Sequence, residues 1–182
     1  MKKLAIATSL VAAMAAISGA QAASTGTINF NGLLTATTCN VSVNEQGAEG
    51  ATVTLPTIGT NVLAQTGDTA ARTSFNMLLS ECSGTLENAA AYFEAGSSVD
   101  LTTGRLKNMT GDANNVELQL RDGSSDTQEV IQVGSDTQID GMKYVDITSG
   151  TATLPYLVEY YATDATTAGT VVSSVVYHIQ YK

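Results

Sequence analysis

The two cysteines are the residues with the most definite chemistry in this chain. Cys39 and Cys82 are its only cysteines, and they do not form a C-x-x-C pair. An even cysteine count in an exported protein indicates a disulfide. A catalytic or metal-binding thiol pair is the alternative, but the only histidine is His178, so such a site has few possible partners. We therefore predict a disulfide formed in an oxidising compartment such as the periplasm. The loss of conformational entropy in the unfolded chain would make this disulfide stabilise the fold by roughly 4 kcal/mol.

The other polar clusters offer weaker chemistry. His178 lies on the predicted outward face of a strand, with no nucleophile or base placed beside it. The acidic turn at residues 122–126 lacks the spacing and the terminal glutamate of a calcium loop. The tripeptides that begin at Asn40 and Asn108 fit the glycosylation pattern, which is short and occurs often by chance. We therefore predict that the protein is not an enzyme and uses no cofactor or metal.

The N-terminus has the order of a secretory signal peptide. A basic start at residues 1–3 precedes an apolar run at 4–17 and an A-x-A site that ends at Ala22. The apolar run is shorter than the about 20 residues that a spanning helix needs, so we predict a signal peptide at residues 1–22 and no transmembrane segment in the mature chain. Cleavage leaves 160 of the 182 residues, which is enough for one domain. It also removes two of the 8 basic residues and none of the 17 acidic ones. The resulting net negative charge of the mature chain argues against nucleic-acid binding.

The remaining chain has the composition and periodicity of an all-β domain. Threonine, serine, glycine and valine are abundant, as is typical of strands and turns. A weak helical period predicts only a short helical turn within residues 61–72. Many short strands between turn clusters, in one domain of this size, favour an antiparallel sandwich. The segments in which apolar and polar residues alternate, as in half-buried strands, are 53–55, 75–79, 91–93, 116–121, 144–147, 154–161 and 171–181.

Two amphipathic strands are predicted at the ends of the mature chain. On the last strand, one face carries Val175, Tyr177, Ile179 and Tyr181. Because this face is apolar, we expect it to be buried against another part of the protein or against a partner. On the first, one face carries Ile28, Phe30, Gly32, Leu34 and Ala36. The opposite face of the first strand carries Thr27, Asn29, Asn31, Leu33 and Thr35. A glycine among large apolar residues is unusual unless another chain segment approaches closely. Periodicity alone leaves open an ordinary first strand of the domain's own sheet.

Three blocks of residues resemble the corresponding sequences of a known protein family. The first is residues 27–34, followed by Cys39; the second is 74–82, which ends at Cys82; the third is 155–182, with its penultimate tyrosine. In this order they resemble the major structural subunits of chaperone–usher pili, the type 1 fimbrial pilins. With the signal peptide, the resemblance spans nearly the whole chain, although residues 84–150 match only in strand rhythm.

The resemblance implies an incomplete immunoglobulin-like β-sandwich that lacks its last strand, with an N-terminal donor-strand extension. The extension is expected at residues 23–36 and the incomplete domain at 37–182, with Cys39 and Cys82 as the family disulfide. The donor side chains implied for the groove of a neighbouring subunit are Ile28, Phe30 and Leu34, with Gly32 at the position that the family keeps small. The groove-edge and chaperone-contact residues implied are Tyr177, Ile179, Tyr181 and the terminal carboxylate of Lys182, where a neutral residue is more usual.

The implied function is that of a shaft subunit of a surface fibre used in cell adhesion, and the subunit polymerises by donor-strand exchange. The implied partners are copies of the same chain, a periplasmic chaperone and an outer-membrane usher, with minor pilins and a tip adhesin as further candidates. The subunit is expected to pass through the periplasm to an extracellular fimbrium. A self-contained secreted immunoglobulin-like binding module is the alternative, in which residues 27–36 pair within their own chain. A small periplasmic enzyme is a third hypothesis, but it lacks a visible cluster of titratable residues.

Overall fold

The computed structural model describes residues 27–47 and 50–182, so the predicted signal peptide lies outside the described residues. Among the described residues, 27–33 and 34–182 belong to two separate units. Within the described ranges, no helix is long and apolar enough to cross a membrane.

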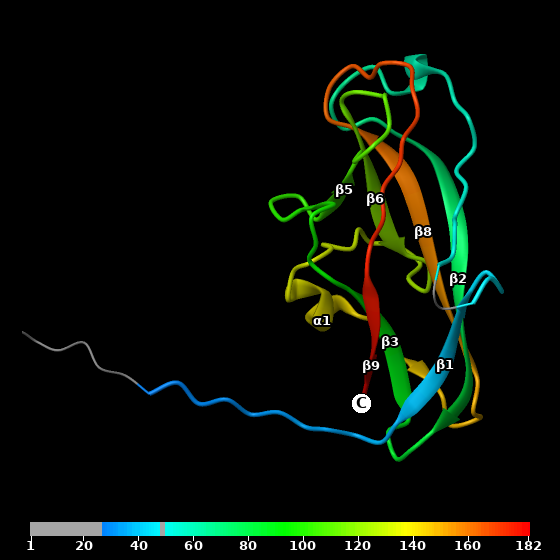
Figure 1. Cartoon of the computed structure of the whole chain (residues 1–182), viewed down its shortest axis with the longest axis vertical. Coiled ribbons are helices and arrows are strands. Elements are labelled where there is room, and N and C mark those ends of the chain that lie inside the picture. Colours follow the sequence, from blue (N-terminus) through cyan, green and yellow to red (C-terminus); the bar gives the residue numbers. More distant parts are fainter. Residues whose placement is uncertain (1–26, 48–49) are drawn as a thin grey trace, which may run out of the picture. The chain divides into compact units, whose positions relative to one another are not determined.

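The larger unit consists of antiparallel strands in two sheets (Figure 1). The first sheet has six strands in the order β1-β2-β8-β6-β5-β4, and the second has three in the order β7-β3-β9. The strands are β1 (Thr38–Val43), β2 (Thr69–Ser83), β3 (Asn88–Phe93), β4 (Val99–Asp100), β5 (Arg105–Lys107), β6 (Val116–Asp122), β7 (Val145–Asp146), β8 (Ala152–Ala162) and β9 (Tyr177–Tyr181). Two short helices, η1 (Thr60–Val62) and α1 (Thr137–Gly141), lie in the connections. The predicted all-β sandwich is therefore confirmed.

The core lies between the two sheets and follows the alternation of the sequence. On β2 the buried residues are Phe75, Met77 and Leu79, and on β6 they include Leu118 and Leu120. Each set lies on one face of its strand because successive side chains point to opposite faces. Tyr156 of β8 packs edge-on against Phe93 of β3, with 5.1 Å between ring centroids, so this aromatic pair joins the two sheets.

The outward face of the large sheet carries a buried carboxylate that the sequence pattern did not indicate. Glu159 of β8 is 1% exposed. Its carboxylate accepts hydrogen bonds from Arg72 at 2.8 Å, Arg121 at 2.5 Å and the amide of Gln119 at 2.8 Å. Burial raises the pKa of Glu159, but these hydrogen bonds outweigh that effect and leave the pKa below its ordinary value. The network therefore ties β2, β6 and β8 together.

Several expected elements differ from the observed ones. The short helical turn expected within residues 61–72 is present as η1, which covers Thr60–Val62 and so begins one residue earlier; the rest of that range is not helical, and β2 begins at Thr69. The strand expected over 171–181 is paired only from Tyr177, since β3 ends opposite that residue. Of residues 144–147, only Val145 and Asp146 pair, and residues 53–55 form no strand. Helix α1 was not expected, because a helix of one turn leaves no readable period.

Candidate functional site

A large apolar cavity opens between the edges of the two sheets. It has a volume of about 820 Å³. One side is lined by β1 and residues 50–55, and the other by residues 173–179. Its floor is the hydrophobic core itself, because the lining includes the core residues Phe75, Met77, Phe93, Leu106, Leu118, Leu120 and Val158. The cavity thus reaches the core along one side of the sandwich, while each of these core side chains stays at most 8% exposed.

A second cavity continues along the same two chain segments. It has a volume of about 690 Å³ and is lined by residues 57–60 and 63 on one side and 166–172 on the other. Val171 and Tyr160 pack against both apolar clusters of the domain, the main core and the smaller cluster around Leu63. We call the two cavities together the open groove. An apolar cavity of about 150 Å³ holds a benzene-sized group, so the open groove has room for several large side chains.

The chain from 171 to 182 leaves one row of backbone groups facing the open groove. Lys182 and Asn88 exchange N–H···O bonds of 3.0 Å in both directions, and the Val176 carbonyl accepts from Glu94 at 2.8 Å. Closer to residue 171, the Val172 carbonyl accepts from Met109 at 2.8 Å. The backbone hydrogen bonds of the even-numbered residues are therefore made with β3 and the chain segments adjoining it. Neighbouring residues of a strand bond in opposite directions, so the odd-numbered residues direct their N–H and C=O groups to the other side, where β9 ends its sheet among the described strands.

The side chains of these odd-numbered residues also line or border the open groove. Tyr177 and Ile179 line the larger cavity, and Ser173 lies near the junction of the two. The Ser173 hydroxyl oxygen is buried and has no hydrogen-bond partner within the described part of the chain. Burial raises the pKa of Tyr177 and of Tyr160, the latter in the smaller cavity. The larger cavity is thus lined mainly by apolar side chains, with the Tyr177 phenol and the unsatisfied Ser173 hydroxyl among its polar groups.

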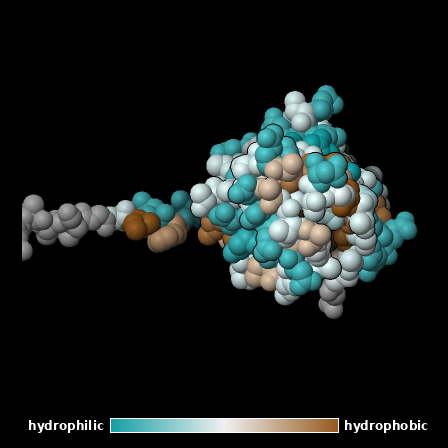
Figure 2. Space-filling view, turned by 90° about the horizontal axis from the view of Figure 1, so that it is seen from above, coloured by the Kyte–Doolittle hydropathy of each residue, from teal (hydrophilic) through white to brown (hydrophobic). Residues whose placement is uncertain are grey.

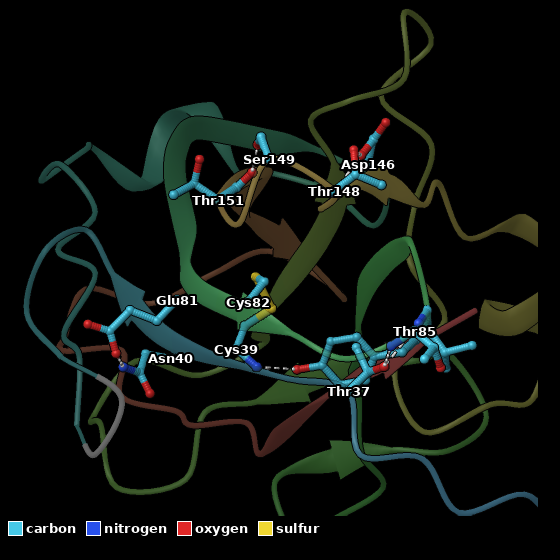
Figure 3. Close-up of a disulfide and its surroundings, with 12 residues drawn as sticks. Thr37, Cys39, Asn40, Glu81, Cys82, Thr85, Asp146, Thr148, Ser149 and Thr151 are labelled. Carbon is cyan, nitrogen blue, oxygen red and sulfur yellow. Dashed lines mark hydrogen bonds between the residues drawn. A yellow bond between two sulfur atoms is a disulfide. The ribbon is translucent and has the colours of Figure 1, made fainter.

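The predicted disulfide is confirmed, and it fixes one end of the open groove. Cys39 of β1 and Cys82 of β2 are bonded, with 4.1 Å between their Cα atoms. They lie where the register of the two strands shifts (Figure 3). The Cys39 N–H donates to the Tyr181 hydroxyl at 3.0 Å. Tyr181 therefore connects β9 to β1 and closes the gap between the two sheets at this end.

A threonine that the sequence analysis missed holds the start of β1. Thr37 is buried, and its hydroxyl accepts from the backbone N–H groups of Thr85 at 3.2 Å and Leu86 at 3.1 Å (Figure 3). The neighbouring Gly84 has φ +122°, and a Cβ there would lie 2.4 Å from the Thr37 Cα. The sequence gives no recognisable signal for this contact, because Thr37 and Gly84 lie far apart in the chain.

The four predicted donor residues belong to a segment that forms no strand. Residues 27–37 have no assigned regular structure, so the strand expected there is absent. The exposed fractions are 77% for Ile28, 88% for Phe30 and 100% for Leu34. A Cβ added at Gly32 would meet nothing within 4 Å. Hydrophobic residues of this segment are exposed in Figure 2. Exposed apolar side chains gathered on one segment are a common feature of interaction surfaces.

His178 of β9 and Lys182, which follows β9, have structural contacts. The Lys182 backbone oxygen accepts from the N–H groups of Glu87 at 3.1 Å and Asn88 at 3.0 Å. Its ammonium group lies 3.9 Å from the centroid of the Tyr144 ring. His178 is exposed on the face away from the core, stacks on Tyr92 and lies 2.9 Å from a Glu94 carboxylate oxygen. The outward orientation predicted for His178 is thus confirmed.

Taken together, the fold and the open groove define a β-sandwich protein with a groove that reaches its core and, among the described strands, an unpaired edge on β9. The profile of the family described as Type-1 fimbrial protein, A (FimA) matches residues 55–182. The chain therefore belongs to the type-1 fimbrial protein family, and it is a structural fimbrial subunit.

Individual relatives agree with this assignment. The chain is 43% identical to the major fimbrial subunit SMF-1 of Stenotrophomonas maltophilia, over 87% of this chain and 94% of that protein. It is 37% identical to the F17 fimbrial protein of Escherichia coli, over 92% and 93% of the two chains.

Solved structures share the fold. The type I fimbria protein BPSL1626 of Burkholderia pseudomallei superposes with a TM-score of 0.53 at 25% identity, over 81% of this chain and 99% of that one. The P pilus rod subunit PapA superposes with a TM-score of 0.57 at 12% identity, over 79% and 99%. The expected incomplete immunoglobulin-like architecture is that of these pilin subunits.

Proposed function

We propose that this chain is a pilus shaft subunit that polymerises by donor-strand exchange, in which residues 27–36 of one copy occupy the open groove of the next. The observation that carries the proposal is the free row of backbone groups on residues 171–181, which borders a groove that reaches the core. An incoming strand satisfies such a row with main-chain hydrogen bonds, and its alternate side chains give register.

The dimensions of the two partners agree. A strand rises by about 3.3 Å per residue, so ten donor residues extend over about 33 Å, close to the length of the eleven residues at 171–181. The donor presents Ile28, Phe30 and Leu34 on one face, and the groove offers two apolar cavities of about 820 and 690 Å³. Burying each such side chain contributes about 1.5–3 kcal/mol.

The same exposed surfaces require protection before assembly. An open apolar groove and an unpaired edge promote aggregation, so the proposal includes a periplasmic chaperone that fills the groove and an outer-membrane usher that receives the subunit. The terminal carboxylate of Lys182, at the end of the β9 edge, is the proposed chaperone contact. The route is through the periplasm to a surface fimbrium. The fibre then presents minor pilins and a tip adhesin.

The alternative of a self-contained binding module needs residues 27–36 to pair within their own chain. That segment forms no strand among the described residues, and this favours exchange between copies.

The test uses the mature chain, residues 23–182, and a synthetic peptide of residues 23–38. Polymers held by donor strands resist SDS without heating, and an excess of the peptide should cap the grooves and keep the chain monomeric. A peptide with Phe30→Ser and Leu34→Ser should leave polymerisation unchanged. A mature chain that stays monomeric without any peptide would support the binding module instead.

A further inference from the structure

The donor segment contains a dipeptide with its own chemistry. Asn31 is followed by Gly32, and no other asparagine in the chain precedes a glycine. Both residues are exposed, and within the described part of the chain no hydrogen bond involves the backbone of either. We propose that Asn31 is a site of spontaneous deamidation in unassembled subunits, and that its isoaspartate product disables the donor strand. The second half of this inference rests on the proposed function.

The reaction needs only this dipeptide and water. The backbone nitrogen of Gly32 attacks the side-chain amide carbon of Asn31, a C–N bond forms, and ammonia leaves. The product is a five-membered succinimide. Water then opens one of its two carbonyl groups, which gives aspartate or isoaspartate at position 31. Because glycine has no Cβ, nothing shields the attacking nitrogen. Asn29 lies in the same segment but precedes Phe30, whose side chain hinders the same attack.

The two products differ in their effect on a strand. Aspartate leaves the main chain unchanged, and residue 31 belongs to the face opposite the donor side chains, so its charge points toward solvent in the filled groove. Isoaspartate instead routes the main chain through the side-chain methylene and adds one atom between Phe30 and Leu34. Strand side chains alternate strictly with a period of two, and a displaced register turns them to the wrong face. Phe30 and Leu34 can then no longer fill their cavities together.

Assembly protects the site. In the open groove the donor backbone is held by ladder hydrogen bonds, which fix the torsions that the attack must change. The strand must open before Asn31 can react. Deamidation therefore inactivates the donor strand of subunits that stay unassembled for a long time, whereas subunits within a fibre keep an intact donor strand.

The chemical test compares two forms of the mature chain in mildly alkaline buffer. In the first, grooves are capped by a donor peptide that carries Asn31→Gln, so each chain's own extension is free; the second is the assembled fibre. Peptide mass spectrometry should find amide-to-acid conversion at Asn31 in the capped chain, with both aspartate and isoaspartate, while Asn29 stays intact. Conversion in fibres should be slower by at least about tenfold. An Asn31 that stays an amide in the capped chain, or that reacts no faster than Asn29, would overturn the inference.

The functional test compares three capping peptides of residues 23–38, with asparagine, aspartate or isoaspartate at position 31. The first two should prevent polymerisation at similar concentrations, and the isoaspartate peptide should need at least about tenfold more, as expected for the loss of one anchor side chain. Equal capping by the isoaspartate peptide would overturn this part of the inference. Failure of the unmodified peptide to cap at all would contradict the proposed function, and the conversion of Asn31 would then be measured on the unassembled chain without a capping peptide.

Discussion

Leu33 and Leu34 form a matched pair for testing which face of the donor segment enters the open groove. They are adjacent and identical in type, and both are exposed in the structure, at 82% and 100%. The alternation places Leu34 on the donor face with Phe30, and Leu33 on the opposite face. Donor-strand exchange buries only the first of them, so the two truncations must differ.

The magnitude follows from burial. Replacing a core leucine by alanine costs about 2–5 kcal/mol, because the transfer free energy is lost and a cavity remains. At 1.4 kcal/mol per factor of ten, Leu34→Ala should weaken donor binding by roughly 30-fold or more. Leu33→Ala removes an exposed side chain, and such changes stay within about 0.5 kcal/mol.

The assay uses a chain in which a copy of residues 27–36 follows Lys182 through a short flexible linker, so that the donor fills its own groove. If the appended donor copy runs antiparallel to β9, its first residue lies near Tyr181, so a short linker is enough to join it to Lys182. Guanidinium unfolding gives the free energy of each variant of the appended copy. Equal losses for the two alanine variants, or a larger loss for Leu33→Ala, would refute the assignment of the donor face.

Three further predictions concern the domain that carries the groove. The double variant Cys39→Ser, Cys82→Ser should lose roughly 4 kcal/mol of unfolding free energy, and a reducing agent should reproduce this loss in the native chain but leave the variant unaffected. Gly84→Ala should lower the unfolding free energy by at least about 1–3 kcal/mol, because of the positive φ and the clash with Thr37, and equal stability in guanidinium would show that this turn relaxes freely. Because the folded-state pKa of Glu159 is lowered, its contribution is complete above the ordinary glutamate pKa and is lost as the pH falls through the lowered value. Glu159→Gln should therefore destabilise the chain at neutral pH and reduce the pH dependence of unfolding on the acid side, and an unchanged pH profile would contradict this role.

Alternation along the sequence predicted the parts of the fold whose strands have partners. Residues 75–79, 116–121 and 154–161 pair and bury one face as expected, and the cysteine count predicted the disulfide. The pattern succeeds there because a paired, half-buried strand satisfies both its backbone and its side-chain period.

The same pattern was less accurate around the open groove, for a physical reason. Residues 53–55 and 171–176 alternate like strands but form none, because no described strand pairs with their free edge. The alternation at 27–36 likewise describes a strand that the unassembled chain does not form. Under the proposed donor-strand exchange these segments pair only in the fibre, and a single chain therefore shows no strand there.

The polar contacts could not be predicted. Glu159 and Gln119 occupy outward positions on their strands, where a polar residue is normally solvated, and their burial depends on arginines from β2 and β6. Thr37 is likewise positioned by residues 85 and 86. Contacts between residues so distant in sequence depend on the completed packing.

Residue-resolved hydrogen exchange would test the central proposal most directly. It compares the chain with the appended donor copy and the same chain with Phe30→Ser and Leu34→Ser in that copy. We predict that the amides of Val175, Tyr177, Ile179 and Tyr181 exchange slowly only with the native donor, while those of His178 and Gln180, which pair with β3, are protected in both chains. Odd-numbered amides that exchange equally fast in the two chains would contradict a donor strand at this edge.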